Sequence, residues 1–547
     1  MSKFNDSCRN PIEKIGEDWF YPDRVKVEYR MNKTNKKVIL MVIDACASRV
    51  FNQAIKSGKL PNLQALAEAG QLKPQSIAIF PSLTPAATST LFTGDYPSRH
   101  GILGFHWYDL DKNEVAYYGD DFWTIARRGV RPFFEDLLLK LNHERLQAET
   151  AFQRIERSGL KAACFNFLMF RGDVEHKANV PLLLGLIPGV PFSEVICGPS
   201  TMFYGDLVNS NAKGKALETI GGMFRRFGFN DDNTFKLLHQ FAEQRAFPDF
   251  SIAYFPDNDY FSHDVGPNNA VTTLEHFDEQ LGTLFEIYGG LEQLLSEVTI
   301  ILTGDHAQSV MVDDEEDSEI RLDHLLSDFT IATVGQPWGD NDQLVICPDM
   351  RCAQIYFKDL NPKQIEHILA LLIADKRVDQ LIWQAKYLGE GDKGYYVTTL
   401  DRGRLKFWPG ADGPNHAVDA YGCPWSWEGS LAAVGGQLNG DNIITFETYP
   451  NAFERIAGAL DNSNSGHLWL TARLGYEFGV AETSIHVGGG SHGSLHKLDS
   501  TSPVLVAGAS SDLVLPDQPR AVDIAPLCFS LLGVESPYPM GASRKLG

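Results

Sequence analysis

Short apolar runs that lack polar alternation recur along the chain and predict buried strands. They are rich in β-branched or aromatic residues and are bounded by polar segments. Strands that are covered on both faces of a parallel sheet show such continuous runs, whereas half-exposed strands alternate. We predict strands at Val38–Ile43, Ala162–Phe167, Phe250–Phe255, Val298–Leu302 and Val504–Ala507.

Helical periodicity fills the segments between these runs. Apolar residues recur every three or four positions at Leu274, Phe277, Leu281, Leu284 and Tyr288. This spacing is typical of an amphipathic helix. The alternation of strands and helices predicts a doubly wound α/β fold with a largely parallel sheet flanked by helices.

The local composition of the sequence changes at about residue 330. From about residue 330 to 479 the sequence is rich in Gly, Trp and Pro loops, with a helix start at Asn361-Pro362. After residue 479 the sequence again shows strand-like runs and loops similar to those before residue 330. We expect an N-terminal extension (1–35), a main core (36–329 and 480–547) and an inserted cap subdomain (330–479).

Composition excludes several classes of partner. The 547 residues are 44% hydrophobic and 22% charged, with a net charge of −22, as in an ordinary globular protein. Such an acidic chain repels long nucleic acid. We find no run long and apolar enough for a membrane span and no apolar signal-peptide segment near the first residue. We expect a cytoplasmic protein; its oligomeric state is left open.

The eight cysteines are scattered and form no CxxC pair. This usage predicts free, mostly buried thiols in a reducing compartment rather than a disulfide framework.

Three predicted strands are followed by carboxylate or imidazole side chains. In open parallel sheets, ligands bind beyond the carboxyl ends of the strands, so these side chains are expected to meet at one edge. Carboxylate and imidazole are ligands that a borderline divalent metal such as zinc prefers. The residues are Asp44 after the first strand, Asp259 and His263 after the third, and Asp305 and His306 after the fourth.

A glycine-rich loop provides a further histidine. In HVGGGSHGSLH, the glycines around His492 allow a close approach to a crowded site. His486 or His496 of the same loop could be the ligand instead, and a flexible turn without a metal role is the plain alternative.

Thr84 precedes Pro85, which suits the first position of a helix. Thr84 is therefore expected to be the N-cap of that helix. The same hydroxyl lies at the positive end of the helix dipole, where an alkoxide is stabilised, and a neighbouring metal lowers its pKa further. Thr84 is thus both a capping residue and a candidate nucleophile.

The ordered set of motifs resembles the type I phosphodiesterase/nucleotide pyrophosphatase family of the alkaline phosphatase superfamily. The resemblance is carried by order, spacing and flanking residues over 36–310 and 480–540. The motifs are Asp44, Thr84 in FPSLTP…FTGDYPSRHGI, Asp259 and His263 in DYFSHDVGP, Asp305-His306, and His492 in GGSHG.

The resemblance implies an alkaline-phosphatase-like core and a hydrolase that cleaves small phosphodiesters or pyrophosphates. It also implies two divalent metal ions, most simply zinc, and attack by Thr84 on phosphorus to give a phospho-threonine intermediate. On this resemblance, one ion would be held by Asp259, His263 and His492, and the other by Asp44, Asp305, His306 and the Thr84 oxygen.

One position departs from the family pattern. Relatives usually carry an asparagine shortly after the His-Gly-Ile motif, where it contacts a phosphoryl oxygen. Here the motif starts at His100 and the matching residue is Phe105, so a donor expected to stabilise transition-state charge is missing. The Thr84 backbone N–H or His106 could compensate.

Other functions stay open. Phosphomonoester or phosphonate (phosphonoacetate-type) hydrolysis would use the same metal site, and a non-catalytic metal-binding protein is the alternative outside enzymes. Sulfatases are disfavoured because Thr84 lacks their C/S-x-P-x-R context. The stretches Phe105–Asp109 and Pro424–Trp427 are candidates for an aromatic wall or for ordinary packing.

Overall fold

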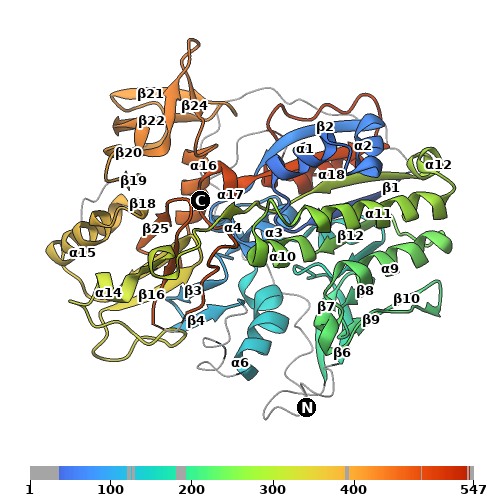
Figure 1. Cartoon of the computed structure of the whole chain (residues 1–547), viewed down its shortest axis with the longest axis horizontal. Coiled ribbons are helices and arrows are strands. Elements are labelled where there is room, and N and C mark those ends of the chain that lie inside the picture. The colour runs from blue at the N-terminus through green and yellow to red at the C-terminus, as the bar shows by residue number, and fades with distance from the viewer. Residues whose placement is uncertain are drawn as a thin grey trace.

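Two large β-sheets of different architecture dominate the described part of the chain, which also holds five two-stranded sheets (Figure 1). The computed structural model describes residues 36–119, 125, 130–179, 193–388, 393–481, 483–538 and 541. The expected N-terminal extension, 1–35, lies outside these residues.

The first sheet has eight strands and is largely parallel at its centre. Strands β13, β1, β12, β5 and β8 run parallel to one another, whereas β2, β28 and β9 are antiparallel to their neighbours. The order is β2 (Gly70–Ile77), β28 (Thr501–Ala507), β13 (Val298–Thr303), β1 (Lys37–Ile43), β12 (Phe250–Phe255), β5 (Ala162–Phe165), β8 (Thr201–Tyr204) and β9 (Val208–Asn209).

All five strands predicted from the apolar runs belong to this sheet, which confirms the predicted fold class. The direction of β28 could not be predicted from its run. A continuous apolar run reports burial on both faces, and β28 is buried at every position although it is antiparallel.

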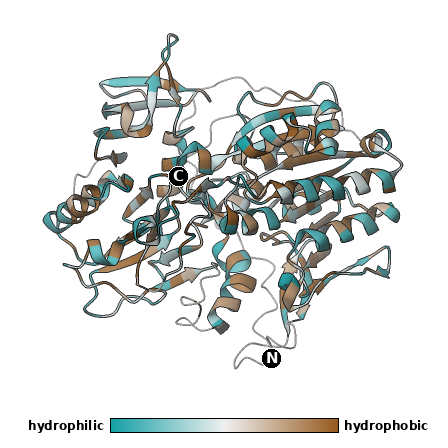
Figure 2. Ribbon diagram, viewed as in Figure 1, coloured by the Kyte–Doolittle hydropathy of each residue, from teal (hydrophilic) through white to brown (hydrophobic). Residues whose placement is uncertain are grey.

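Helices cover both faces of the first sheet. Alternate residues of β1 point to opposite sides: Val38 and Leu40 enter one apolar cluster, and Ile39 and Met41 enter the other. Figure 2 shows hydrophobic residues concentrated along the central strands. The helices of the first cluster are α3 (Thr84–Thr93), α7 (Ala151–Arg157) and α18 (Ile524–Leu532). Those of the second are α1 (Ser48–Lys56), α2 (Pro61–Glu68), α9 (Asp231–Glu243), α11 (Val271–Tyr288) and α12 (Leu291–Glu297).

The second sheet has ten strands and is almost entirely antiparallel, drawn in yellow to orange in Figure 1. Helices α15 (Pro362–Ala374) and α16 (Ala452–Leu460) pack against it. The order is β16 (Leu344–Asp349), β17 (Cys352–Phe357), β25 (Leu468–Ala472), β18 (Val378–Gln384), β19 (Tyr395–Thr398), β20 (Arg404–Pro409), β22 (Pro424–Gly429), β21 (Asn415–Asp419), β24 (Ile443–Phe446) and β23 (Gly436–Leu438).

The second sheet contacts the segment that leads into α3. Phe80 and Leu83 share an apolar cluster with residues of the second sheet. The rings of Phe80 and Trp469 lie 5.2 Å apart between centroids. The start of α3, and with it Thr84, is therefore packed between the two sheets.

The cysteines follow the prediction with one exception. Cys197 is disulfide-bonded, so the expectation of a free thiol is wrong there. Cys8 lies outside the described residues. Free and buried are Cys46, Cys164, Cys347, Cys352, Cys423 and Cys528.

Across the described ranges, we find no helix with the length and apolar character that a membrane crossing requires.

Candidate active site

The strand ends converge as the sequence predicts. Strands β13, β1 and β12 are parallel neighbours, so the residues that follow them meet at one edge of the sheet. Asp44 follows β1, and Asp305 and His306 follow β13. Asp259 and His263 lie on α10 (Asp257–Val265), which begins directly after β12. Because they are four residues apart on a helix, they share one face.

The first group of candidate ligands is Asp44, Asp305 and His306, and all three residues are buried. Each offers one ligand atom, and these atoms lie within 4.8 Å of one another. Nε2 of His306 is 3.4 Å from Oδ1 of Asp44 and 3.7 Å from Oδ2 of Asp305. This group is called the β1/β13 group below.

The second group is Asp259, His263 and His492, whose ligand atoms meet the same 4.8 Å limit. Nε2 of His263 is 3.4 Å from Oδ2 of Asp259, and Nε2 of His492 is 3.6 Å from Oδ1. The stacked rings of His306 and His492, 3.9 Å apart between centroids, join this α10/loop group to the β1/β13 group.

The glycine-rich loop before β28 brings His492 close to α10. A Cβ atom on Gly489 would lie 1.8 Å from the backbone oxygen of His263, so no larger residue fits without a shift of the backbone. The prediction that glycine permits this approach is confirmed at Gly489. The loop is fixed further by short strand pairing between β14 (Ser309–Val310) and β27 (Gly490–Ser491).

Thr84 does not cap its helix. Leu83 is the N-cap of α3, and Thr84 is the first helical residue, so the expected capping role is wrong. Oγ1 of Thr84 instead lies 3.1 Å from Nε2 of His306. The Thr84 hydroxyl thus reaches the β1/β13 group.

The other hydroxyl residues of α3 have structural partners. Because every residue of α3 is buried, hydroxyl groups there need hydrogen bonds within the protein. Thr88, Ser89 and Thr93 each donate to a backbone oxygen four residues earlier, at 2.6 to 2.7 Å. Thr90 Oγ1 lies 3.0 Å from Nε2 of His100.

The imidazoles are oriented by backbone oxygens. Nδ1 of His263 donates to Gly490 O at 2.8 Å, and Nδ1 of His492 donates to Ser82 O at 2.7 Å. These bonds turn each Nε2 toward the carboxylates, as in metal-ligating histidines whose second nitrogen is held by the protein.

The carboxylates of the β1/β13 group each keep one oxygen without a hydrogen bond. Oδ2 of Asp44 accepts from the Tyr254 hydroxyl, and Oδ1 of Asp305 accepts from the Ala45 and His306 amides. Among the described residues, Oδ1 of Asp44 and Oδ2 of Asp305 have no hydrogen-bond partner. Burial, together with the charge of Asp305, raises the pKa of Asp44 well above its usual range, and burial also raises the pKa of Asp305.

The α10/loop group is partly neutralised by its own ion pair. Burial opposes ionisation of both partners, but the charge of Asp259 and its hydrogen bond raise the pKa of His263 to about 9. The imidazoles of His263 and His492 hold the pKa of Asp259 below its usual range despite burial. Burial and the charge of His306 lower the pKa of His492 well below its usual value.

These features fit divalent cations. The buried carboxylates of Asp44 and Asp305 converge with the half-buried carboxylate of Asp259. The unpaired atoms Oδ1 of Asp44, Oδ2 of Asp305 and Nε2 of His492 are directed into the two groups. Carboxylate oxygen and imidazole nitrogen are the donor set of borderline divalent metals.

The other two histidines of the loop have different partners. Nδ1 of His486 lies 2.9 Å from Oε1 of Glu477. His496 is the N-cap of α17 (Lys497–Ser500) and accepts from the Leu498 amide. Neither belongs to the two ligand groups found among the described residues.

Sequence reasoning missed three residues that support the carboxylates. Tyr254 donates to Asp44, and Asn258 donates to the backbone oxygen of Asp44 at 2.8 Å. Gln308 donates to Oδ1 of Asp259 at 2.5 Å. Gln308 lies two residues after His306, so position beside a candidate ligand was the available signal.

The family model for type I phosphodiesterase / nucleotide pyrophosphatase matches residues 38–495. The chain belongs to the type I phosphodiesterase/nucleotide pyrophosphatase family. It is accordingly a hydrolytic enzyme, and membership supports hydrolysis of phosphoesters.

Solved structures with the same fold include murine ectonucleotide pyrophosphatase/phosphodiesterase 5. It is 14% identical, with a TM-score of 0.54 over 93% of this chain and 98% of that one. Phosphonoacetate hydrolase from Sinorhizobium meliloti 1021, solved with phosphonoformate, is 16% identical. Its TM-score is 0.52 over 92% of this chain and 97% of that one.

Within this phosphodiesterase family the departure at Phe105 has a structural explanation. The Phe105 ring packs against apolar clusters of both sheets. Its amide donates to Asp349 at 3.0 Å, as does that of His106 at 3.3 Å. Nδ1 of His106 lies 3.3 Å from Pro348 O of the second sheet, and its ring lies edge-on to that of Tyr117, 5.4 Å away between centroids.

The two aromatic stretches contribute to packing. Trp107 is buried in the core beneath the first sheet, and Trp425 and Trp427 are buried in the second. None of these three indoles is exposed enough to form an open wall.

Proposed function

We propose that this enzyme cleaves small phosphodiesters or pyrophosphates, including nucleotide-like substrates, with two divalent metal ions that are most simply zinc. Asp44, Asp305, His306 and the Thr84 oxygen would hold one ion. Asp259, His263 and His492 would hold the other. The observation that carries the proposal is the 3.1 Å contact of the Thr84 hydroxyl with His306, in place of a capping bond.

Thr84 is the proposed nucleophile. Its Oγ1 attacks phosphorus while the bond from phosphorus to the leaving oxygen breaks, and the hydroxyl proton passes to solvent. The product is a phospho-threonine, which water hydrolyses to restore the hydroxyl. When bound, two such metal ions lower the pKa of a nearby hydroxyl and stabilise charge on the attacking and leaving oxygens.

The helix position of Thr84 supports this role. As the first residue of α3, Thr84 lies at the positive end of the helix dipole, where negative charge on oxygen is stabilised. A form of the murine relative described as inactive carries alanine in place of a threonine and was solved with AMP. By analogy, we assign a catalytic role to Thr84 of this chain.

The second candidate function keeps the same site and changes the substrate. Phosphonoacetate hydrolase shares the fold, and Phe105 replaces the asparagine that nucleotide-cleaving relatives usually carry. Phosphonate or phosphomonoester hydrolysis therefore remains the alternative substrate class.

The domain organisation is part of the proposal. We assign 36–329 and 480–547 to the catalytic core and 330–479 to an inserted cap subdomain. The second sheet, from β16 to β25, lies between the sequence segments that form the first, which supports an insertion.

A substrate panel tests the function. Protein loaded with zinc is assayed with bis-p-nitrophenyl phosphate, p-nitrophenyl phosphate and phosphonoacetate, with metal content measured beside it. We expect the diester to be preferred and about two ions per chain. A preference for the monoester by ~100-fold, about 2.7 kcal/mol of transition-state free energy, overturns the diester assignment. Preferred cleavage of phosphonoacetate favours the second candidate.

A further inference from the structure

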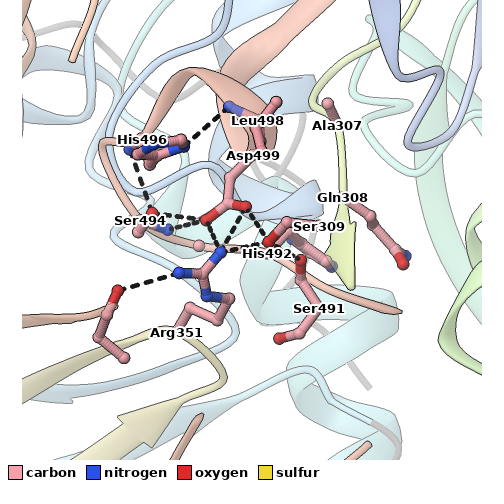
Figure 3. A network of polar contacts seen from close by, with 12 residues as sticks. Ala307, Gln308, Ser309, Arg351, Ser491, His492, Ser494, His496, Leu498 and Asp499 are labelled. Carbon is pink, nitrogen blue, oxygen red and sulfur yellow. Dashed lines mark hydrogen bonds and ion pairs between the residues drawn. The ribbon is translucent and has the colours of Figure 1, made fainter. Parts of the chain in front are cut away.

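A fully buried arginine of the second sheet lies directly behind the His492 loop. Arg351 is in the turn between β16 and β17. Its Nη1 donates to both oxygens of Asp499, at 2.7 and 2.9 Å, and its Nη2 donates to Ala472 O at 3.0 Å (Figure 3). The Arg351 amide donates to the backbone oxygen of His492 at 3.0 Å. The second sheet thus holds the main chain of a candidate ligand.

The partner carboxylate, Asp499, joins the two segments that carry His306 and His492. Ser309 Oγ donates to Oδ1 of Asp499 at 2.7 Å, and Ser494 Oγ and N donate to Oδ2 at 2.5 and 3.3 Å. Ser309 is three residues after His306, and Ser494 is two residues after His492. The backbone oxygen of Asp499 also accepts from Ala307, at 2.9 Å.

We propose that Arg351 and Asp499 are positioning residues that fix the ligands of both metal groups, so the second sheet forms part of the metal site. The inference rests on the proposed function, because it assigns a role toward the metal ions proposed there.

A role in positioning explains this pair better than a role in stability alone. A buried ion pair contributes little more to folding than a well-packed apolar pair does. The planar guanidinium, however, is held by Asp499 at Nη1 and by Ala472 O at Nη2, which fixes direction as well as distance. Here it fixes the backbone beside two histidines, and support of this kind around metal ligands changes affinity by about 10- to 100-fold.

The chain offers a matched control at Arg520. This arginine is also buried, and its Nη1 likewise donates to both oxygens of a carboxylate, that of Glu454, at 2.9 and 2.8 Å. It also pairs with Asp523. Neither acidic partner is a candidate ligand, so Arg520→Met removes a comparable network away from the ligand loops.

The experiment measures zinc affinity of chelator-treated full-length protein by competition with a chromophoric chelator. We expect Arg351→Met to bind zinc about 10- to 100-fold more weakly, with Arg520→Met within about 3-fold of wild type. Both variants should show a lower melting temperature, since each leaves a buried carboxylate without its cation. Equal zinc affinity in the two variants overturns the proposal. Wild-type protein that takes up no zinc instead contradicts the proposed function.

Two further measurements apply if Arg351→Met does not fold. Arg351→Lys keeps the charge but loses the planar guanidinium and its Nη2 bond to Ala472 O, and we expect a partial loss of zinc affinity. In wild-type protein, coupling must be reciprocal, so zinc should slow amide hydrogen exchange at Arg351 and Ser494. Exchange at both amides that does not change with zinc would falsify the positioning role.

Discussion

The two ligand groups differ in how the negative charge of their carboxylates is compensated. In the β1/β13 group, two carboxylates lie beside one imidazole, and one oxygen of each has no hydrogen bond in the described structure. In the α10/loop group, Asp259 is compensated by His263 at 3.4 Å and supported by Gln308. Without a cation, the negative charge of the β1/β13 group is uncompensated, whereas that of the α10/loop group is largely compensated within the group. The β1/β13 group therefore depends more on an added positive charge than the α10/loop group does.

The largest expected effect concerns the hydroxyl that joins the β1/β13 group. Thr84→Ala should lower kcat for bis-p-nitrophenyl phosphate by about 10³-fold or more, roughly 4 kcal/mol, because the nucleophile is lost. Thr93→Ala is the matched control, since Thr93 bonds the backbone of the same helix at its far end. Comparable activity of Thr84→Ala and wild type would break the assignment of Thr84.

The pH dependence of stability tests the difference in charge compensation between the two groups. In metal-free protein, the pKa of His263 is raised to about 9, so its contribution is complete below pH ~6.5 and is lost as pH rises through 9. A shift of this size corresponds to about 3 kcal/mol. Denaturant unfolding from pH 6 to 9.5 should show this decline in wild type and less of it in His263→Gln.

The effect of Asp44 and Asp305 on stability begins at a lower pH than that of His263. Burial raises the pKa of both carboxyls, so the folded state binds more protons than the unfolded state. Stability of the metal-free protein therefore falls as pH rises above about 4, the unfolded value. Equal pH slopes in wild type and Asp305→Asn would contradict this assignment.

Single amide substitutions should move the stability of metal-free protein in opposite directions. Asp305→Asn removes an uncompensated buried charge and should raise the free energy of unfolding by about 1 kcal/mol. Asp259→Asn breaks the pair with His263 and should lower it by about 1–3 kcal/mol. Both variants should bind less zinc. Changes of the same sign in the two variants would remove the distinction between the groups.

The smallest effect is expected at the edge of the α10/loop group. The His486 ring lies 4.0 Å from that of His263 between centroids, and His486→Phe keeps this ring contact. Metal content should stay at the wild-type value, and kcat/KM should change less than about 10-fold. Loss of one ion per chain in His486→Phe would make His486 a ligand after all.

The sequence alone determined the features that depend on local patterns. Continuous apolar runs predicted five neighbouring strands of the first sheet, because burial on both faces imposes the same run wherever the strand lies. Asp and His at the strand ends predicted a shared edge, because parallel neighbours align their carboxyl ends. The family followed from the order of these motifs along the chain.

Only the tertiary structure decided how distant segments meet. His492, rather than His486 or His496, joins Asp259 because strand pairing at β27 and the bond to Ser82 O set its position. Thr84 faces His306 instead of capping α3. Arg351 and Asp499, 148 residues apart, show no sequence signal, because their pairing depends on the packing of one sheet against the other. Periodicity reports the surroundings of each residue, whereas long-range contacts are fixed by the folded chain.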